Sequence, residues 1–457
     1  MIHLIILIVS LGTIMLLAYL GYSTIITAPI IALITLFLTF GLDSHLMANY
    51  TLVYMDGFST FIKNYFPLFL TGAIFAKLME ETGYAHSIAH SITKWIKPKR
   101  AILAVVLSGA LLTYGGVSLF VVAFVLYPIA TYLFQEADIP KRLIPGTIAL
   151  GAFTFTMTAL PGSPEIQNVI PMTYFKTDTF AAPLIGIMAS LLMFTLGLLY
   201  LNYRVTSAKK NHEGYGFKEN IKLDVCSEIP SIWLAISPIL IIFILNLFFS
   251  KIYYPNIDGT YLEEFNTTLD SLSGTWSVLI SIVIAIFFIL LVNRKRLRNL
   301  QQMLETGVKN SFVPLLNSSA IVGYGSIIKT LPIFIGIQAL ILNLSSNPII
   351  TESLSVNIIC GLTASASGGL GITLDALAPT FLQLSEPLGI TPEILHRIAA
   401  LSSGGLDTLP HNGAVITTLA ICGLTHKQAY KDIFVTSVLI PISVTALIVI
   451  FTSMIYI

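Results

Sequence analysis

The most constraining feature of this sequence is a series of apolar stretches, each about as long as a membrane-spanning helix and separated from the next by a short polar segment. A helix needs about 20 mostly apolar residues to cross the hydrocarbon core of a bilayer. Of the 457 residues, 55% are apolar and only 10% are charged, which argues against a water-soluble fold. We expect ten crossings, which occupy Ile2 to Leu20, Thr24 to Leu42, Phe66 to Met79, Leu143 to Tyr174, Phe180 to Tyr203, Ser231 to Phe249, Gly274 to Val292, Ser311 to Ile328, Ile394 to Gly423 and Ile433 to Ile457.

The charges and the cysteines argue against several other classes of protein. Lys and Arg total 24 and Asp and Glu total 23, so the chain has no basic field that would attract nucleic acid. Cys226, Cys360 and Cys422 are odd in number and lack a C-x-x-C spacing, which argues against a disulfide framework or a zinc ribbon. We expect the cysteines to be buried packing residues, and we assign no cofactor and no metal.

The basic residues predict how the chain is threaded, because Lys and Arg are retained on the cytoplasmic side of a membrane. Five clusters, at 94–100, 141–142, 204–222, 294–309 and 427–431, hold 18 of the 24 basic residues. The opposing loops are acidic or neutral. One threading satisfies every loop, and it places both termini outside the cytoplasm.

Two apolar stretches do not fit as single crossings, because each joins loops that lie on the same side. They are Ala101 to Phe134 and Val356 to Leu384, and each has a glycine-rich centre, at 113–118 and 365–371. We predict that both are re-entrant hairpins, the first entering from the cytoplasm and the second from outside. Non-helical backbone at membrane depth persists only where protein or a water-filled cavity satisfies it. Two such tips therefore indicate a site.

The two hairpins belong to a weak internal repeat. Gly115-Gly116 recurs as Gly368-Gly369 and Leu160-Pro161 recurs as Leu409-Pro410, at offsets of 253 and 249 residues. Because the hairpins enter from opposite sides, the repeats are predicted to be inverted, as in many secondary transporters. We expect residues 1–100 and 311–354 to form scaffold parts. Residues 101–180 and 355–457 are expected to form transport parts, the second of which also includes the final crossing. Residues 181–310 are expected to connect the two repeats.

A long apolar helix with an interrupted centre follows each hairpin, at 156–168 and at 402–413. Pro and Gly inside an apolar span indicate an unwound helix. Ser163 followed by Pro164 predicts an N-cap and a first helical residue, and Asn412 is expected to cap the second restart. The sequence thus predicts four half-helix N-termini at membrane depth, two after the breaks and two near Ser118 and Ile372.

Half-helix N-termini that meet in a cavity favour an anion, because each carries partial positive charge and free N–H donors. A carboxylate is the expected guest. The alternative for the hydroxyl groups at these points is that they bond to carbonyls of their own helices. The predicted substrate-binding residues are Tyr114, Gly115, Gly116, Ser118, Thr158, Gly162, Ser163, Asn168, Ser367, Gly368, Gly369, Thr373, Ser402, Ser403, Gly404, Gly405, Thr408 and Asn412.

Ionisable residues inside a membrane are costly and mark function by default. An acid beside an anion site repels the anion unless it is protonated, so proton and anion are expected to cross together. Asp407 is the first candidate for proton coupling, and Glu165, Asp375 and His411 are the others. The alternative for Glu165 is a partner of the helix dipole, and the alternative for Asp375 is a cap or an ion pair within the scaffold. The alternative for His411 is a packed neutral imidazole.

The remaining charged residues are expected to be structural. His396 and Arg397 open a crossing and are predicted to be solvated near the outer surface. We assign no role to the connecting segments at 49–66 and 204–228, and we expect an interfacial helix at 85–95.

Three runs of residues resemble the GntP family of gluconate and hydroxy-acid permeases, and within it the D-β-hydroxybutyrate permease branch. They are 113–120, 151–171 and 401–413, and the resemblance covers nearly the whole chain. It implies a proton symporter of the bacterial inner membrane in the ion transporter superfamily, whose members are dimers with a scaffold domain and an elevator-like transport domain. The chain departs from gluconate permeases at the first hairpin and break, and it lacks the Ser-Asn-Thr tips of sodium-coupled relatives. The first departure disfavours gluconate as the substrate, and the second disfavours sodium as the coupling ion.

Together these features predict an all-α polytopic membrane protein that imports a small monocarboxylate, such as 3-hydroxybutyrate, by proton symport. The expected partners are this organic anion, protons, the lipid bilayer and a second copy of the chain. No Walker motif, H-E-x-x-H motif or triad spacing is present, so no enzymatic activity is expected. The alternatives are a cation/proton exchanger, a sodium-coupled carboxylate transporter, and a membrane hydrolase that uses Ser163 and His411.

Overall fold

The computed structural model describes residues 2–20, 22–96, 100–117, 119–216, 230–294, 297, 299–332, 345, 347–363, 365–410 and 412–456. All regular secondary structure within these residues is helical. The α-helices are α1 Ile2–Tyr19, α2 Thr24–Phe40, α3 Leu46–Ala48, α4 Met55–Glu81, α5 Tyr84–Trp95, α6 Ala101–Tyr114, α7 Leu119–Glu136, α8 Ile144–Ala152, α9 Phe155–Thr158, α10 Ile166–Phe175, α11 Pro183–Lys210, α12 Ile232–Phe248, α13 Leu269–Val292, α14 Leu300–Thr330, α16 Pro348–Thr363, α17 Ala366–Ser385, α18 Pro392–Ser403, α19 Gly413–Ile421, α20 His426–Ile433 and α21 Ile440–Ile455.

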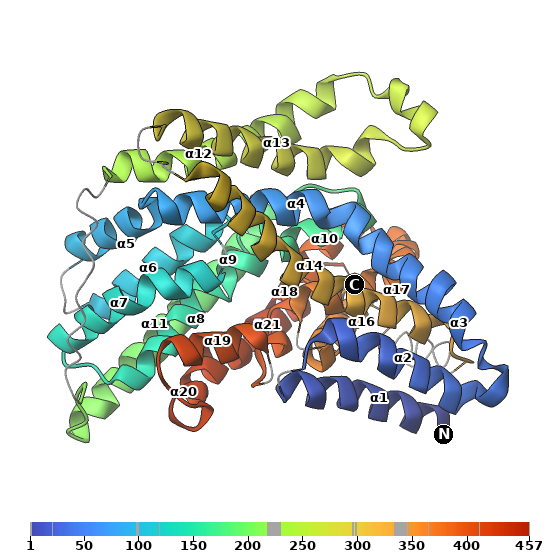
Figure 1. Cartoon of the computed structure of the whole chain (residues 1–457), viewed down its shortest axis with the longest axis horizontal. Coiled ribbons are helices and arrows are strands. Elements are labelled where there is room, and N and C mark those ends of the chain that lie inside the picture. The colour runs from blue at the N-terminus through green and yellow to red at the C-terminus, as the bar shows by residue number, and fades with distance from the viewer. Residues whose placement is uncertain are drawn as a thin grey trace.

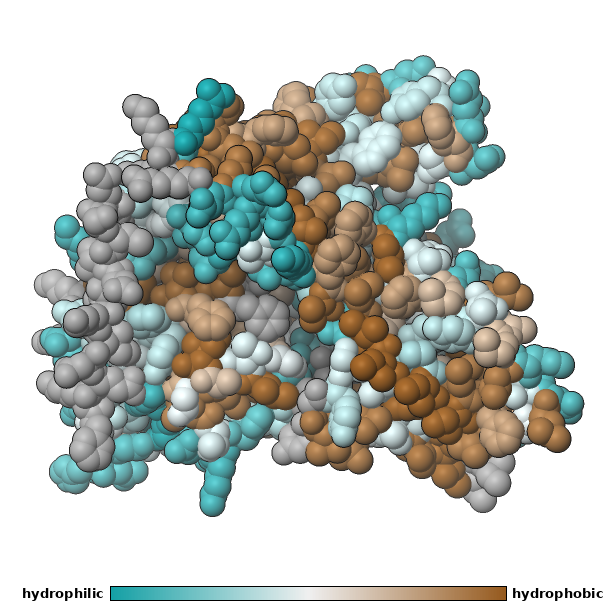
Figure 2. Space-filling view, viewed as in Figure 1, coloured by the Kyte–Doolittle hydropathy of each residue, from teal (hydrophilic) through white to brown (hydrophobic). Residues whose placement is uncertain are grey.

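Several helices of the described chain have the length and composition of membrane spans. Six such segments lie at Thr24–Ser44, Pro183–Lys210, Ile232–Asn256, Leu269–Val292, Leu300–Thr330 and His426–Ile455. Large apolar side chains on these helices point outward, as at Leu184, Leu199 and Trp233, which are 75%, 62% and 75% exposed. Apolar residues accordingly cover broad areas of the face in Figure 2. An outward apolar surface of this kind suits lipid contact.

One expected loop is helical. Residues 49–66 were expected to form an outer connection, but a π-helix at Asn49–Tyr54 runs directly into α4. Tyr54, Phe61 and Tyr65 are buried on one side of this helix, and the Tyr54 hydroxyl donates to the Ala320 carbonyl of α14 at 3.1 Å. The polar residues on the opposite side of the helix obscured this buried stripe in the sequence. α4 and α14 pack along each other, and α14 crosses the centre of the view in Figure 1.

Both predicted hairpins are present as antiparallel helix pairs with short turns. α6 and α7 are joined through Gly115 and Gly116, and Gly116 has a φ of +81°, which favours glycine. In the second pair, α17 begins before the glycines rather than near Ile372, because the Ser365 hydroxyl accepts the N–H of Gly368 at 3.0 Å and caps the helix. A Cβ on Gly369 would lie 2.5 Å from the Cα of Cys360, so this glycine permits α16 and α17 to pack closely.

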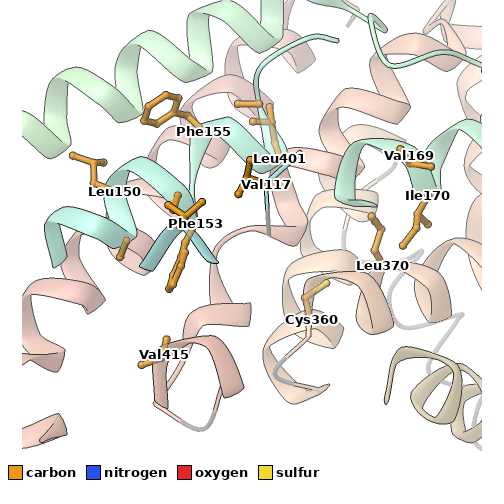
Figure 3. Packing of buried hydrophobic residues seen from close by; sticks show 14 of the residues in the cluster. Val117, Leu150, Phe153, Phe155, Val169, Ile170, Cys360, Leu370, Leu401 and Val415 are labelled. Carbon is orange, nitrogen blue, oxygen red and sulfur yellow. The ribbon is translucent and has the colours of Figure 1, made fainter. Parts of the chain in front are cut away.

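Each interrupted helix contacts both hairpins. Before its break, α8 packs against α6 of the first hairpin and α18 packs against α16 of the second. After the breaks the partners are exchanged, because α10 packs against α17 and α19 packs against α7. Figure 3 shows the first of these contacts, with Val169 and Ile170 of α10 beside Leu370 of α17 and with Cys360 nearby. Cys360 and Cys422 are buried as expected, whereas Cys226 lies outside the described residues.

Candidate functional site

The first break separates α9 from α10 by an extended loop. Ser163 was expected to cap the second half-helix, but α10 begins at Ile166 and its N-cap is Glu165, whose backbone is extended at φ −65° and ψ 144°. The Ser163 hydroxyl instead accepts the N–H of Glu165 at 3.4 Å. The helix therefore restarts two residues later than predicted.

The tip of the first hairpin lies against this break. The Tyr114 hydroxyl donates to the Pro161 carbonyl at 2.8 Å. A Cβ on Gly116 would lie 3.3 Å from the ring of Pro164. Gly162 has a φ of +81°, and a Cβ there would lie 2.6 Å from the ring of Phe180 and 3.0 Å from the Tyr114 hydroxyl. The structure thus brings together Tyr114, Gly116 and Gly162, which were predicted from separate motifs.

The second break is fixed from the C-terminal side. After α18 a short 3-10 helix, Leu406–Thr408, leads into α19. The Thr408 hydroxyl donates to the Ser437 carbonyl at 2.9 Å, and the Tyr430 hydroxyl donates to the Thr408 carbonyl at 3.2 Å. These two bonds fix the irregular backbone of the second break to the helical segments that follow α19.

Asn412 caps α19, as the sequence predicted. Its Oδ1 accepts the N–H groups of Ala414 at 2.7 Å and Val415 at 3.1 Å. We expect Asn412→Ala to lower the free energy of unfolding by about 1 kcal/mol, because two N–H donors lose their acceptor. Asn412→Ser, which retains a capping oxygen, should lower it less, and thermal unfolding in detergent measures both. Equal effects of the two substitutions would contradict the capping role.

The two breaks meet. A Cβ on Gly404 would lie 2.5 Å from Cγ2 and 3.1 Å from Oγ1 of Thr158, so the second break is in contact with the end of α9. A Cβ on Gly405 would lie 3.0 Å from the side-chain oxygen of Asn357 on α16. Elements from the two halves of the chain thus converge on one region, as the sequence predicted for the breaks.

The predicted hydroxyl groups mostly bond to nearby protein groups. Four of them donate to carbonyls three or four residues earlier, as the alternative interpretation expected. These are Thr158 to Thr154 at 3.2 Å, Thr373 to Gly369 at 2.8 Å, Ser403 to Ala400 at 2.8 Å and Thr408 to Gly405 at 3.2 Å. The Ser402 hydroxyl bonds that of Ser353 at 2.8 Å, and the Ser367 hydroxyl bonds that of Ser318 on α14 at 2.8 Å. A role for these hydroxyls in substrate binding stays a prediction.

The acidic candidates lie in different environments. Asp407 is only 8% exposed, and its Oδ1 has no hydrogen-bond partner among the described residues. Glu165 is half-buried at the start of α10 and makes no side-chain capping bond. Asp375 pairs with Lys329 of α14, which is the ion pair that the alternative interpretation expected. His411 and Ser118, two further predicted residues, lie outside the described residues.

A fourth acid escaped the sequence analysis. Glu352 on α16 is fully buried, and neither carboxyl oxygen has a partner in the described part of the chain. The hairpin was expected to begin at Val356, which left Glu352 in a loop, whereas α16 begins at Pro348. The apolar residues Ile349 and Ile350 after this proline were the signal for the earlier start.

His396 and Arg397 were expected to be solvated, and this prediction is wrong, because both side chains are fully buried. Their position at the start of an apolar stretch suggested the membrane surface, but α18 is covered on its sides by α10, α16 and α17. His396 bonds the Thr177 hydroxyl through Nδ1 at 2.6 Å and the Asn168 side-chain oxygen through Nε2 at 3.2 Å.

Asn168 lies at the centre of this buried polar cluster. Its side-chain nitrogen donates to the Ser163 carbonyl at 2.9 Å and to the Thr179 carbonyl at 3.0 Å. Its side-chain oxygen accepts from His396 and, at 3.0 Å, from Arg397. The side-chain amide of Asn168 is fully engaged in hydrogen bonds, so it fixes the conformation of the first break. Asn168 can contact a substrate only if one of these bonds is exchanged.

Comparison with known proteins gives a consistent result. The sequence pattern of the family described as GntP family permease matches residues 2–455. A relative from Bacillus subtilis (strain 168), named uncharacterized transporter YxjC, is 43% identical over 468 residues and covers 98% of this chain and 99% of its own length. An uncharacterized transporter of Haemophilus influenzae (strain ATCC 51907 / DSM 11121 / KW20 / Rd) is 26% identical over 182 residues, which cover 39% of this chain and 41% of its own.

The fold is similar to that of a solved transporter structure. The YdaH transporter of Alcanivorax borkumensis, described as having an unusual topology, superposes with a TM-score of 0.58 at 15% sequence identity. The match covers 90% of each chain. At this identity the likeness concerns the fold alone.

Proposed function

This chain belongs to the GntP family of permeases, a secondary transporter with several membrane spans, and from that premise we propose that it imports a small organic monocarboxylate together with protons. The proposed substrate is a short hydroxy-acid of the 3-hydroxybutyrate type. The proposed location is the bacterial inner membrane, with both termini outside the cytoplasm.

The observation that carries this proposal is the contact between the two breaks at Thr158 and Gly404. Interrupted helices at membrane depth are where secondary transporters bind their substrates, because the freed backbone groups need partners there. The α10 start, the Tyr114 tip and the second break adjoin this contact. The N–H groups at such half-helix starts favour a negatively charged guest over a cation.

The exchanged packing of the hairpins supports an inverted repeat. α6, α7 and α8 pack on one another as α16, α17 and α18 do, and α10 packs against α17 as α19 packs against α7. We propose that these eight helices form the transport part and that α4 and α14 belong to the scaffold, with the transport part moving as an elevator within a homodimer. Comparison of inward- and outward-facing structures tests this motion.

Proton coupling is proposed to run through buried carboxyl groups. A carboxylate without a partner in a low-dielectric interior is strongly disfavoured, so such a group holds its proton until water or a partner reaches it. Asp407 remains the first candidate, and Glu352 joins it on the same physical grounds. Asp375 is a weaker candidate, because it is already paired with Lys329.

We expect Asp407→Asn to abolish accumulation of the acid driven by a pH gradient while leaving exchange at equilibrium, because the amide cannot carry a proton. Uptake of labelled 3-hydroxybutyrate into proteoliposomes, with and without an imposed pH gradient, measures both activities. Asp258→Asn, which changes a fully exposed acid in the loop after α12, is the matched control and should accumulate normally.

Three results would contradict the proposals. Full accumulation by Asp407→Asn removes this residue from the coupling mechanism. Cation exchange by the native protein, without uptake of any short hydroxy- or keto-acid at two pH values, replaces the symporter with the cation/proton exchanger. Uptake that depends on a sodium gradient favours the sodium-coupled alternative.

A further inference from the structure

We propose that Arg397 is a positioning residue that supplies the fixed positive charge by which this transporter selects an anion, acting through the first break and without touching the substrate. The inference rests on the proposed carboxylate transport and assigns a residue to its charge selectivity. Arg397 lies on α18, in the second half of the chain, while the groups that hold it lie in the first half.

All five N–H donors of Arg397 are engaged, and every acceptor is uncharged. Nε donates to the Ala181 carbonyl at 3.0 Å. Nη1 donates to the Ala159 carbonyl at 3.2 Å and to the Asn168 side-chain oxygen at 3.0 Å. Nη2 donates to the carbonyls of Thr179 at 3.1 Å and Ala181 at 2.8 Å. These bonds orient the guanidinium and leave no donor free for a substrate.

The same bonds leave the charge of Arg397 in place. Carbonyl and amide dipoles solvate a cation but do not neutralise it, and no carboxylate of the described chain lies within 4.0 Å of the guanidinium. His396, the adjacent imidazole, fits its two bonds as a neutral ring, because Nε2 must donate to the Asn168 oxygen while Nδ1 accepts from the Thr177 hydroxyl. Asp178 is an acid whose charge acts on Arg397, and it pairs with Lys251 at 2.7 Å.

The location of this charge matches the place where an anion is proposed to bind. Ala159, which accepts from Nη1, directly follows Thr158, the residue in contact with the second break. Gly186 of α11 leaves room for the Arg397 guanidinium, since a Cβ on Gly186 would lie 3.2 Å from Nε of Arg397. At an effective dielectric near 20, a unit charge several Å from an anion changes its affinity by roughly one to two powers of ten.

A purely structural role is the competing interpretation, because Arg397 also ties to α18 three carbonyls of the two loops that flank α10, those of Ala159, Thr179 and Ala181. The two roles differ in what a lysine restores. Lysine keeps the charge but loses the planar five-donor fork, whereas glutamine loses both. Stability therefore reports the fork, and the affinity for an anion reports the charge.

The experiment compares Arg397→Lys with Arg397→Gln in proteoliposomes, using labelled 3-hydroxybutyrate and its uncharged amide as a competitor. We expect both variants to unfold at lower temperature. The KM of the acid should stay within about threefold for Arg397→Lys and rise tenfold to a hundredfold for Arg397→Gln. Inhibition by the uncharged amide should change little in either variant. Equal KM values for the two variants, or equal loss of acid and amide, overturn the proposal.

Asp178→Asn provides a test that does not depend on a buried substitution. The asparagine side chain retains an oxygen that can accept the Phe180 N–H, as Asp178 does at 2.8 Å, and the substitution removes the negative charge that opposes Arg397. We expect the KM for the acid to fall severalfold, and an unchanged or higher KM contradicts the proposal. If the native protein takes up no carboxylate, the proposed function fails as well, whereas normal native uptake with equal variants removes only the role of Arg397.

Discussion

We expect Gly151→Ala to be among the most destabilising single changes in this protein, because it forces apart the backbones of α6 and α8. A Cβ on Gly151 would lie 2.6 Å from the carbonyl oxygen and 3.1 Å from the Cα of Val106. These are main-chain atoms that cannot rotate away. Overpacking of this kind costs about 1–3 kcal/mol, and backbone contacts place Gly151 at the upper end. The midpoint of thermal unfolding in detergent measures the loss, and transport should fall with it because α6 carries the Tyr114 tip.

Gly72→Ala is the matched control for this prediction. Gly72 lies inside α4, and a Cβ there would meet no atom within 4 Å. Alanine is the better helix former by up to about 1 kcal/mol, so this variant should be as stable as the native protein or more stable. If Gly151→Ala unfolds at the same temperature as Gly72→Ala, the close contact between α6 and α8 is wrong.

Asp432→Asn is expected to have a comparably large effect through charge rather than volume. Asp432 is 1% exposed, and its carboxylate accepts from Arg204 at 2.7 Å, from Arg142 at 3.1 Å and from the Tyr200 hydroxyl at 2.8 Å. Removing one partner of a buried ion pair costs about 3–5 kcal/mol because the remaining charge is left uncompensated. Both arginines are partly exposed, so we expect a loss near the lower value. Thermal unfolding at pH 7 measures it.

The control for this charge effect is Glu80→Gln, which removes an exposed partner of Lys77 and should cost less than about 1 kcal/mol. Equal losses for the two variants would contradict the special role of Asp432.

Arg142 also pairs with Glu213 at 2.6 Å and holds the pKa of that carboxyl below its usual value. A lowered pKa means that the pair contributes stability above the ordinary pKa of a glutamate, and that this contribution is lost as the pH falls through the lowered value.

The sequence predicted the parts of this fold whose signals are local. Pro161, Gly162 and Pro164 within an apolar stretch indicated the first break, and Asn412 indicated the cap of α19, because backbone conformation at these residues is restricted by the residues themselves. The pair Gly115-Gly116 likewise marked the first hairpin turn, whereas Gly368-Gly369 lies inside the first turn of α17. The residue at which α10 restarts depends on whether helical backbone begins after Ser163 or after Glu165. The contacts of the loop decide this, and the residue types do not.

Arg397 and Glu352 show what the sequence did not predict. Four of the five bonds of Arg397 go to backbone carbonyls 216 to 238 residues away, and a carbonyl leaves no trace in the residue type. A charged residue near the start of an apolar stretch has the same pattern whether water or protein surrounds it. Glu352 was misplaced because a helix boundary was set eight residues too late.

The exchange of partners between the two hairpins has a consequence for biogenesis. α7 can pack against α19 only after some 280 further residues have been synthesised, and the carbonyls of Ala159 and Ala181, on either side of α10, gain their bonds only once Arg397 has been made. The N-terminal half therefore enters the lipid with polar backbone that nothing yet covers. Insertion and assembly are therefore expected to be separate stages, because α19, which completes the packing around the first hairpin, is made only near the end of the chain.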